Sequence, residues 1–254
     1  MARFLVLLYG VVCYLAFFAT ILYMIGFVGD LVVPKSVSSG AAGPVGQAIV
    51  INIALLLLFG IQHSVMARRS FKAWFTRVIP HGAERSTYVL ASSLALIILF
   101  AFWQPLPGTL WQVEAGAGAA ILWGIFAAGW VLVFLASFMI NHFELFGLQQ
   151  AFQYFRGKPA VQIPFKMPFL YRYVRHPLQL GFLLALWSTP NMTVSHLMFS
   201  VGLTVYILVG LAYEERDLLS FHGDKYRIYR QSVPKLIPFT KRGAQPSVTE
   251  EMAE

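Results

Sequence analysis

Long uncharged runs dominate the chain, and the charged residues gather in the segments between them. Residues 4–28 form an uninterrupted run of 25 residues without a charge. A helix rises about 1.5 Å per residue, so this run is long enough to cross a hydrocarbon core of about 30 Å. The pattern predicts an all-α integral membrane protein with five to six transmembrane helices. The further apolar runs are residues 48–66, 88–103, 115–140, 178–189 and 194–213.

The run at residues 178–189 is shorter than the others. As a helix, its 12 residues would span only about 18 Å, which is too little to cross a bilayer alone. Pro190 and Asn191 interrupt it before the last long run begins. We therefore expect the last two runs to form a C-terminal helical hairpin whose first arm is short or tilted.

Lysine and arginine are distributed unevenly among the connecting segments. Eighteen of the nineteen lie near the N-terminus, in residues 67–87 and 141–177, or in the C-terminal tail, and only Lys35 lies in the other set of loops. Positive residues concentrate on the cytoplasmic side of membrane proteins. The asymmetry predicts a multi-pass protein with both termini in the cytoplasm.

The composition agrees with a membrane protein and narrows the possible chemistry. Of the 254 residues, 58% are hydrophobic and 12% are charged, which is about half the charged share of a soluble domain. The net charge of +8 is explained by orientation signals and lipid-headgroup contacts, so no nucleic-acid partner is expected. Cys13 is the only cysteine, and none of the six histidines has a zinc-ligand spacing, so no metal site is expected.

The distribution of polar groups predicts a functional division near residue 140. Residues 1–140 hold four spans with few polar groups. Residues 141–242 hold a long polar loop, the membrane hairpin and a charged tail, and residues 243–254 are expected to be disordered. The sequence predicts no oligomeric state.

Two polar stretches near the membrane carry candidate chemistry. Pro177 suits the first turn of a helix, which puts His176 at the N-terminal end of the short arm. Unpaired N–H groups at such an end favour an anionic group such as a carboxylate. Glu214 and Glu215 follow the last apolar run, and the hairpin returns them to the same membrane face. Together these groups suit a zwitterionic or cationic ligand, with plain salt bridging to neighbouring arginines as the alternative.

The motif RHPLQLG, followed by EERDLLSFHGDKYRIYRQSVPKLIP, resembles the C-terminal signature of the isoprenylcysteine carboxyl methyltransferase and phospholipid methyltransferase superfamily. The resemblance covers roughly residues 171–239 and implies a cytoplasmic pocket for S-adenosylmethionine. It departs from the family pattern at Gln179, where a tyrosine is usual. The cofactor-binding residues that it implies are Arg175, His176, Pro177, Gly181, Glu214, Glu215, Tyr226 and Tyr229. For the two tyrosines, an amphipathic tail helix is the alternative.

Three further segments, QHSVMAR, ERSTYVL and NHFELFGLQQ, place ionisable groups at one membrane depth, which is a functional-site hypothesis by default. They resemble the methanethiol S-methyltransferases, a bacterial membrane branch of the superfamily, and its NnrU-like relatives. With them the resemblance covers most of the chain. It implies methyl transfer from S-adenosylmethionine to methanethiol, a small volatile thiol, giving dimethyl sulfide in the bacterial inner membrane. Hydrogen sulfide is a further acceptor that it implies.

Such a reaction needs a base, because the thiolate is the nucleophile and the thiol must first lose its proton. A neutral histidine suits this role near physiological pH. We expect His63 or His142 to be the base, with Glu144 orienting it and Arg85 pairing with a carboxylate. Tyr88 and Asn141 are the expected substrate contacts.

Three alternatives remain open at this point. One is an NnrU-like haem-binding membrane protein or isomerase in which His63 and His142 are axial ligands. Another is a methyltransferase that acts on a prenylcysteine or a phospholipid. The third is a structural membrane protein with a vestigial cofactor pocket.

Overall fold

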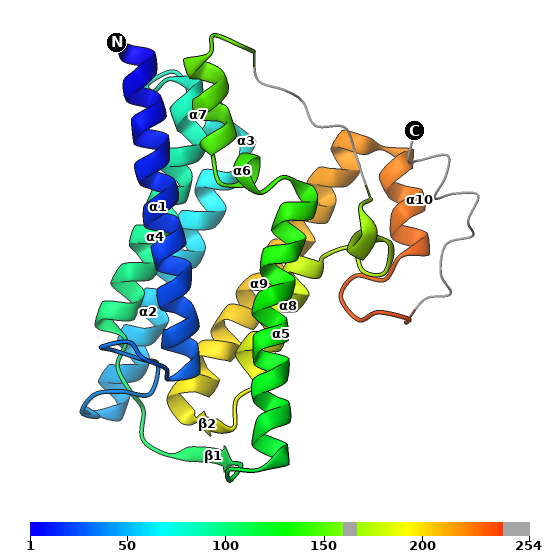
Figure 1. The fold of residues 1–254 in the computed structure, drawn as a ribbon. Helices are drawn as coiled ribbons and strands as arrows, with labels where there is room; N and C mark the ends of the chain where they lie inside the picture. Colours follow the sequence, from blue (N-terminus) through cyan, green and yellow to red (C-terminus); the bar gives the residue numbers. More distant parts are fainter. Residues whose placement is uncertain (160–166, 241–254) are drawn as a thin grey trace. The chain divides into compact units, whose positions relative to one another are not determined.

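Five helices in the computed structural model, which describes residues 1–159 and 167–240, are long and apolar enough to cross a membrane (Figure 1). Their number confirms the predicted all-α membrane fold. The chain is therefore a multi-pass membrane protein. The five helices are α1 (Ala2–Gly29), α2 (Val45–Ala67), α4 (His81–Phe102), α5 (Ala117–Ile140) and α9 (Val194–His222).

Shorter elements connect these helices. The expected short arm is α8 (Pro177–Trp187), whose 11 residues correspond to about 16 Å of helix. The sequence did not predict the two strands, which pair antiparallel and join the segment after α4 to the turn before α9. The remaining elements are α3 (Arg69–Phe75), β1 (Thr109–Gln112), α6 (His142–Leu145), α7 (Leu148–Phe155), η1 (Phe169–Arg172), β2 (Asn191–Thr193) and α10 (Asp224–Ser232).

At two ends a helix extends well beyond its apolar run. Helix α4 begins at His81, seven residues before the apolar run at Tyr88, and α9 continues past Tyr213 to His222. In both places a polar segment extends an apolar helix, because charged residues end a hydrophobic run without disfavouring a helix. Helix α9 ends at His222, and the next residue, Gly223, has a positive φ of 55° that favours glycine. Glu214 and Glu215 therefore lie within α9 and not after it.

By packing, the described residues form two compact units, each built from three segments of the chain. Among the described residues, unit 1 draws on 1–114, 143–159 and 190–203, and unit 2 on 115–142, 167–189 and 204–240. Helix α9 contributes to both. The functional division near residue 140 stays a prediction. The expected disorder of residues 243–254 lies outside the described residues.

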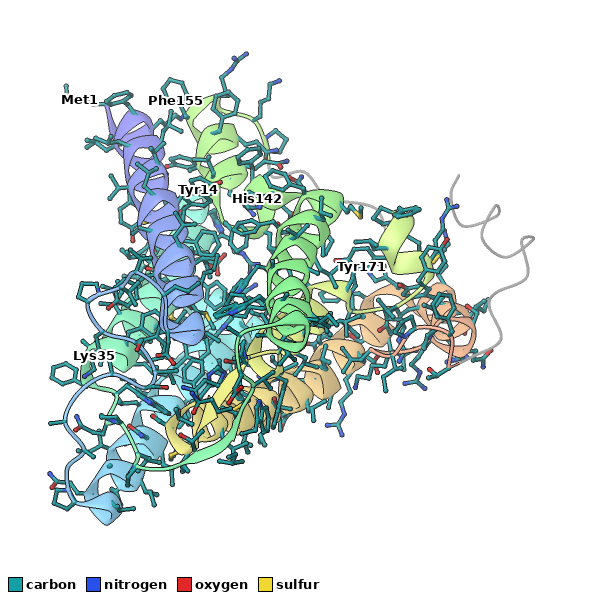
Figure 2. The ribbon with its side chains drawn as sticks, turned by 60° about the horizontal axis from the view of Figure 1, so that its bottom comes forward. Met1, Tyr14, Lys35, His142, Phe155 and Tyr171 are labelled. Atoms are coloured by element: carbon teal, nitrogen blue, oxygen red, sulfur yellow. The ribbon has the colours of Figure 1, made fainter. Side chains whose placement is uncertain are left out.

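Polar contacts tie the helices of unit 1 together at both ends. The Tyr9 hydroxyl donates to Thr87 Oγ1 at 3.0 Å and joins α1 to α4. At the other end, buried Asn52 donates to the Gln104 carbonyl and accepts from the Gln104 N–H, both at 2.8 Å. These two hydrogen bonds give a partner to both backbone groups of Gln104, just after α4, as buried backbone groups require. Figure 2 shows Met1 and Phe155 at one end of this unit and Lys35 at the other.

In unit 2, two glycines let the short helix α8 pack directly on α5. A Cβ on Gly129 would lie 2.7 Å from both the Ala185 nitrogen and the Gly181 oxygen, and a Cβ on Gly181 would lie 2.6 Å from the Gly129 oxygen. Small residues at facing positions allow membrane helices to approach this closely. The packing holds α8 in place although it is too short to cross a bilayer.

Replacing Gly129 by alanine should lower the stability of unit 2, because the added methyl group forces the backbones of α5 and α8 apart. Overpacking of this kind costs about 1–3 kcal/mol. Gly124 lies on the same helix with no atom within 4 Å of its would-be Cβ, so Gly124→Ala is the matched control. The measurement is the unfolding temperature of the purified protein in detergent. Equal unfolding temperatures for the two variants would contradict this packing.

Candidate functional site

The site in unit 2 is built around the N-terminus of α8. His176 is the N-cap residue and Pro177 the first helical residue, and no side chain caps the helix. The first-turn N–H groups of such a helix have no partner within the helix. The N–H groups of Arg175 and His176 donate to the carbonyls of Pro234 and Lys235 at 2.9 and 3.2 Å. The segment after α10 therefore runs alongside the start of α8.

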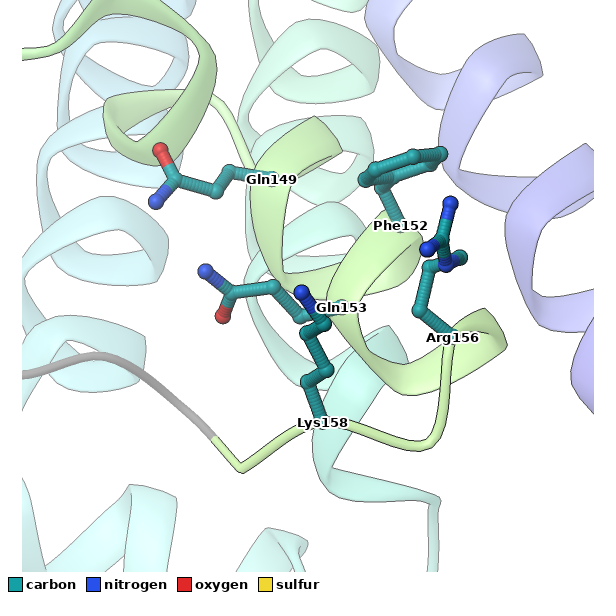
Figure 3. A pocket seen from close by; sticks show the side chains of 5 residues that line it. All are labelled: Gln149, Phe152, Gln153, Arg156 and Lys158. Atoms are coloured by element: carbon teal, nitrogen blue, oxygen red, sulfur yellow. The ribbon is translucent and has the colours of Figure 1, made fainter.

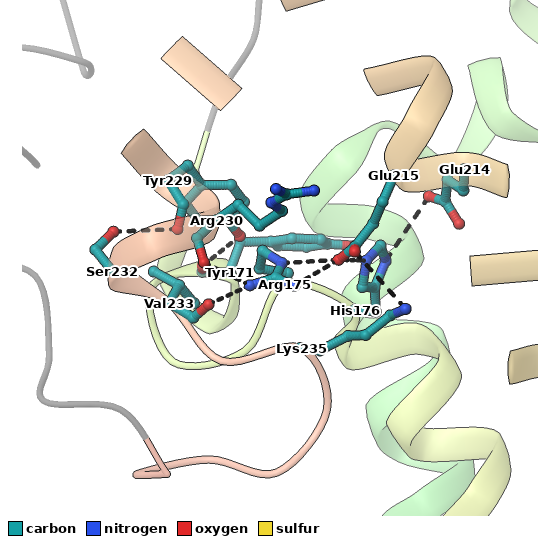
Figure 4. A network of polar contacts seen from close by, with 10 residues as sticks. All are labelled: Tyr171, Arg175, His176, Glu214, Glu215, Tyr229, Arg230, Ser232, Val233 and Lys235. Atoms are coloured by element: carbon teal, nitrogen blue, oxygen red, sulfur yellow. Dashed lines mark hydrogen bonds and ion pairs between the residues drawn. The ribbon is translucent and has the colours of Figure 1, made fainter. Parts of the chain in front are cut away.

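A buried ion pair between Arg175 and Glu215 lies at the centre of the site (Figure 4). Arg175 donates from Nε and Nη2 to Glu215 Oε1 at 2.9 and 2.6 Å. Its Nη1 donates to the carbonyls of Arg230 and Val233 at 2.9 and 2.5 Å. A buried charge is tolerated only when it is paired and hydrogen bonded in this way. One guanidinium thus fastens α9 and the end of α10 to the start of α8.

The two adjacent carboxylates have different surroundings. Glu215 also contacts His176 Nε2 at 3.1 Å and Lys235 Nζ at 3.7 Å, and 12% of its side chain is exposed. Glu214 is 46% exposed, accepts from Gln179 Nε2 at 3.3 Å, and lies 3.8 Å from His176 Nδ1. The charge of Glu215 is therefore compensated within the protein. Glu214 is the carboxylate that is open to a ligand.

His176 is neutral at physiological pH. Burial lowers its pKa from the ordinary 6.5 to about 4, although the hydrogen bond to Glu215 acts in the opposite direction. Since the Glu215 carboxylate only accepts, we assign the proton of the imidazole to Nε2 and the lone pair to Nδ1. The Nδ1 lone pair and the Glu214 carboxylate are neighbours. Two electron-rich groups side by side favour a cationic ligand group.

Tyr226 and Tyr229 hold α10 against the rest of unit 2. Both are buried, and they pack with Val233 in one apolar cluster. The Tyr229 hydroxyl donates to the Tyr171 carbonyl at 2.6 Å. Burial raises the pKa of both hydroxyls above the ordinary 10, so they stay neutral. Their expected contact with a cofactor stays a prediction, because the contacts described are structural.

Two other expected cofactor residues, Pro177 and Gly181, lie on α8. Pro177 is buried in the first turn, and Gly181 faces Gly129 of α5. Their contact with a cofactor also stays a prediction. Sequence reasoning missed Lys235, which contacts Glu215. Its signal was its place in the quoted VPKLIP motif, directly after the Val-Pro pair.

Four of the other expected residues come together in unit 1. The Tyr88 hydroxyl lies 2.6 Å from Nε2 and 3.1 Å from Nδ1 of His63. The guanidinium of Arg85 lies 5.0 Å from the centre of the Tyr88 ring, within reach of a cation–π interaction. Burial raises the pKa of Glu144, and the charges of Arg85 and Lys72 oppose that rise. The structure thus brings His63, Arg85, Tyr88 and Glu144 into one unit.

His142 and Asn141 belong to unit 2, at the end of α5. Nδ1 of His142 lies 2.8 Å from the Ser137 hydroxyl, whose hydrogen is donated to the Phe134 carbonyl at 2.7 Å. The imidazole therefore carries its proton on Nδ1 and a lone pair on Nε2. Burial lowers the pKa of His142, which keeps it neutral. Asn141 is the C-cap of α5, and its N–H donates to the Ser137 carbonyl at 3.2 Å.

The described residues offer no group of three histidine, cysteine, aspartate or glutamate side chains that converge on a metal position. His63 and His142, the expected axial ligands of the haem alternative, each have a hydroxyl partner in their own unit.

Comparison with known proteins gives one family and several curated relatives. The model of the family described as "NnrU protein" matches residues 51–236. The chain is 52% identical to methanethiol S-methyltransferase of Mycobacterium tuberculosis, over 95% of this chain and 99% of that protein. It is 50% identical to methanethiol S-methyltransferase of Crocosphaera subtropica, over 94% of each. Nurim of Sus scrofa is 31% identical over 66% of each chain. No solved structure matches.

The lowered pKa of His176 predicts a loss of stability in acid. The unfolded chain takes up a proton near pH 6.5, whereas the folded protein does so only near pH 4. The contribution of His176 is therefore intact above pH 6.5 and is lost as the pH falls toward 4, on the order of 3 kcal/mol in all. The measurement is the unfolding temperature in detergent between pH 7 and 4 for the wild type and His176→Asn.

Other acidic groups of the chain also titrate as the pH falls toward 4, so the difference between the wild type and His176→Asn carries the result. The variant should show the shallower pH dependence. His81→Asn removes an exposed histidine and should follow the wild type. Parallel curves for the wild type and His176→Asn would contradict a neutral, buried His176.

Proposed function

We infer that this chain, which belongs to the NnrU protein family, is a membrane-embedded methyltransferase that converts methanethiol to dimethyl sulfide. The observation that carries the inference is identity of about one half, over nearly the whole length, to curated methanethiol S-methyltransferases. We propose S-adenosylmethionine as the methyl donor and hydrogen sulfide as a further acceptor. We place the enzyme in the bacterial inner membrane with both termini in the cytoplasm, because lysine and arginine concentrate in those segments.

The residues at the N-terminus of α8 fit S-adenosylmethionine, which carries a sulfonium, an ammonium and a carboxylate. The half-exposed Glu214 and the lone pair on His176 Nδ1 would hold the cationic groups. The first-turn N–H groups of α8 would hold the carboxylate. Arg175 and Glu215 would act indirectly, by fixing the wall of the pocket. When bound, this cofactor supplies an electrophilic methyl group with a thioether as the leaving group.

Of the two candidate bases, we infer that His142 accepts the proton of the thiol. It belongs to the same compact unit as the Arg175–Glu215 pair, whereas His63 belongs to the other unit. Ser137 and Phe134 hold the tautomer that has its lone pair on Nε2. Nε2 takes the S–H proton, and the sulfur lone pair forms the new bond to carbon. His63, in its contact with Tyr88, is the alternative base.

The burial of these groups suits the reaction. A thiolate and a sulfonium lose their charges as the methyl group moves, so the transition state is less polar than the reactants. Holding the reacting atoms in line in a site without bulk water lowers the barrier to such a step. His142 and His176 are both buried, so bulk water has little access to either imidazole.

The test of the function is headspace gas chromatography of the purified full-length protein with S-adenosylmethionine and methanethiol. Dimethyl sulfide is the expected product. Glu214→Gln should lower kcat/KM for S-adenosylmethionine by about 10- to 100-fold, which is the effect of a charge-assisted hydrogen bond. Its unfolding temperature should stay close to that of the wild type, because Glu214 has few partners.

Asp224→Asn is the control, because it removes an exposed carboxylate that pairs with Arg227 on the surface of α10. Binding of S-adenosylmethionine in calorimetry without product would redirect the search to prenylcysteine or phospholipid substrates. If S-adenosylmethionine does not bind and no dimethyl sulfide forms, the proposed function is refuted.

The choice of base predicts two different pH profiles. With His142 as base, kcat/KM for the thiol should be level above pH 6.5, because burial holds the pKa of His142 below its ordinary 6.5. His142→Ala should lose about 100- to 10,000-fold. Its remaining activity should rise tenfold per pH unit as free thiolate forms. His63→Ala is the comparison variant. If kcat/KM rises tenfold per pH unit in His63→Ala and stays level in His142→Ala, the base is His63 and not His142.

A further inference from the structure

Helix α7 presents a polar and aromatic surface at the end of unit 1 where α1 begins. Its inner side is packed tightly, since a Cβ on Gly10 of α1 would lie 2.6 Å from the Cβ of Ala151. On its outer side, Phe152 and Phe155 are 49% and 38% exposed, and Phe155 stacks edge-on against Phe4 of α1. Exposed aromatic side chains beside a charged segment are typical of the membrane–water interface.

A turn at Gly157 folds the chain back at the end of α7. The N–H of Lys158 donates to the Gln153 carbonyl at 2.9 Å, and the N–H of Gly157 donates to the Tyr154 carbonyl at 3.1 Å. This pair of bonds, with the φ of 67° at Gly157, is a Schellman motif, which favours glycine at that position. The turn sets Lys158 beside Gln153 instead of leading it away from the helix.

The side chains at this turn line a pocket of about 380 Å³ (Figure 3). Its lining combines two amides, two cations and one aromatic ring, contributed by Gln149, Phe152, Gln153, Arg156 and Lys158. The side chains in Figure 3 come from one short helix and the turn that ends it. The amide, guanidinium and ammonium groups supply N–H donors to one small volume.

Positive charge at the pocket is not balanced within the described chain. Neither Arg156 nor Lys158 forms an ion pair with a carboxylate there, and the same holds for Arg3. Arg3 Nη1 lies 2.7 Å from the position of a Cβ on Gly157. Three cations therefore meet at the start of the first membrane span. The negative end of the α7 dipole favours such cations. An anion with several acceptor oxygens would balance the positive charge that remains.

We propose that this pocket binds the phosphate of an anionic phospholipid. Arg156 and Lys158 would bind the phosphate oxygens, with the amides of Gln149 and Gln153 as further donors. The pocket lies at the end of a membrane span and has an aromatic wall at Phe152, which is where a phospholipid presents its headgroup above its acyl chains. Basic pockets at the ends of membrane helices bind such headgroups. The site is independent of the proposed methyl transfer.

The test is native mass spectrometry of the detergent-purified full-length protein titrated with phosphatidylglycerol and, separately, with zwitterionic phosphatidylcholine. Phosphatidylglycerol should bind at least about tenfold more tightly. Arg156→Gln and Lys158→Gln should each weaken it about fivefold, the effect of one basic residue near an anionic lipid. Gly157→Ala keeps every charge but strains the turn, and should also weaken binding. Arg77→Gln removes an exposed arginine of the α3–α4 segment and should change nothing.

Three results would overturn the proposal. Equal affinity for the two lipids would show that the pocket does not recognise anionic headgroups. If the pocket variants bind phosphatidylglycerol with the same affinity as Arg77→Gln, the lipid binds elsewhere, or the cations serve only to interact with the helix dipole. Displacement of phosphatidylglycerol by an equal concentration of inorganic phosphate would make the pocket a site for soluble phosphate.

Discussion

The buried ion pair between Arg175 and Glu215 is the interaction on which the candidate site depends. An ion pair away from water is stable only if every charge and donor has a partner. Here the guanidinium reaches Glu215 and two carbonyls at the end of α10, and the carboxylate also contacts His176 and Lys235. Removing Glu215 would leave the guanidinium buried without a counter-charge, and removing Arg175 would leave the carboxylate with the more distant Lys235 as its cationic partner. The start of α8, the end of α9 and all of α10 are thus held by one set of polar contacts.

This arrangement separates two roles that look identical in the sequence. Glu214 and Glu215 are neighbours of the same residue type. Glu215 is paired with internal partners, whereas Glu214 is half exposed beside the lone pair of His176. A methyl donor with a positive sulfur needs a negative but accessible group. In the proposed site, the compensated glutamate holds the scaffold and its neighbour would meet the ligand. Gln179, where the superfamily usually has a tyrosine, donates to the exposed carboxylate and so belongs to the same arrangement.

Much of the site was within reach of sequence reasoning because a hairpin returns the chain to the membrane face from which it starts. That geometry was enough to expect Glu214 and Glu215 near His176. It was not enough to place His63 and His142, which the sequence sets at one depth and the structure assigns to different compact units. The last apolar run ends at residue 213 but helix α9 continues to His222, since hydropathy reports where lipid contact ends and not where the helix hydrogen bonds end.

The sequence by itself determined the membrane class, the number of long spans and the family, because these follow from the order of apolar residues and from motifs along the chain. Only the tertiary structure decided which carboxylate is buried, which tautomers His142 and His176 adopt and that α8 rests on α5 through two glycines. These features depend on partners that are remote in sequence, such as Arg175 and Glu215, which are 40 positions apart. Burial and hydrogen bonding between such partners arise only when the chain has folded.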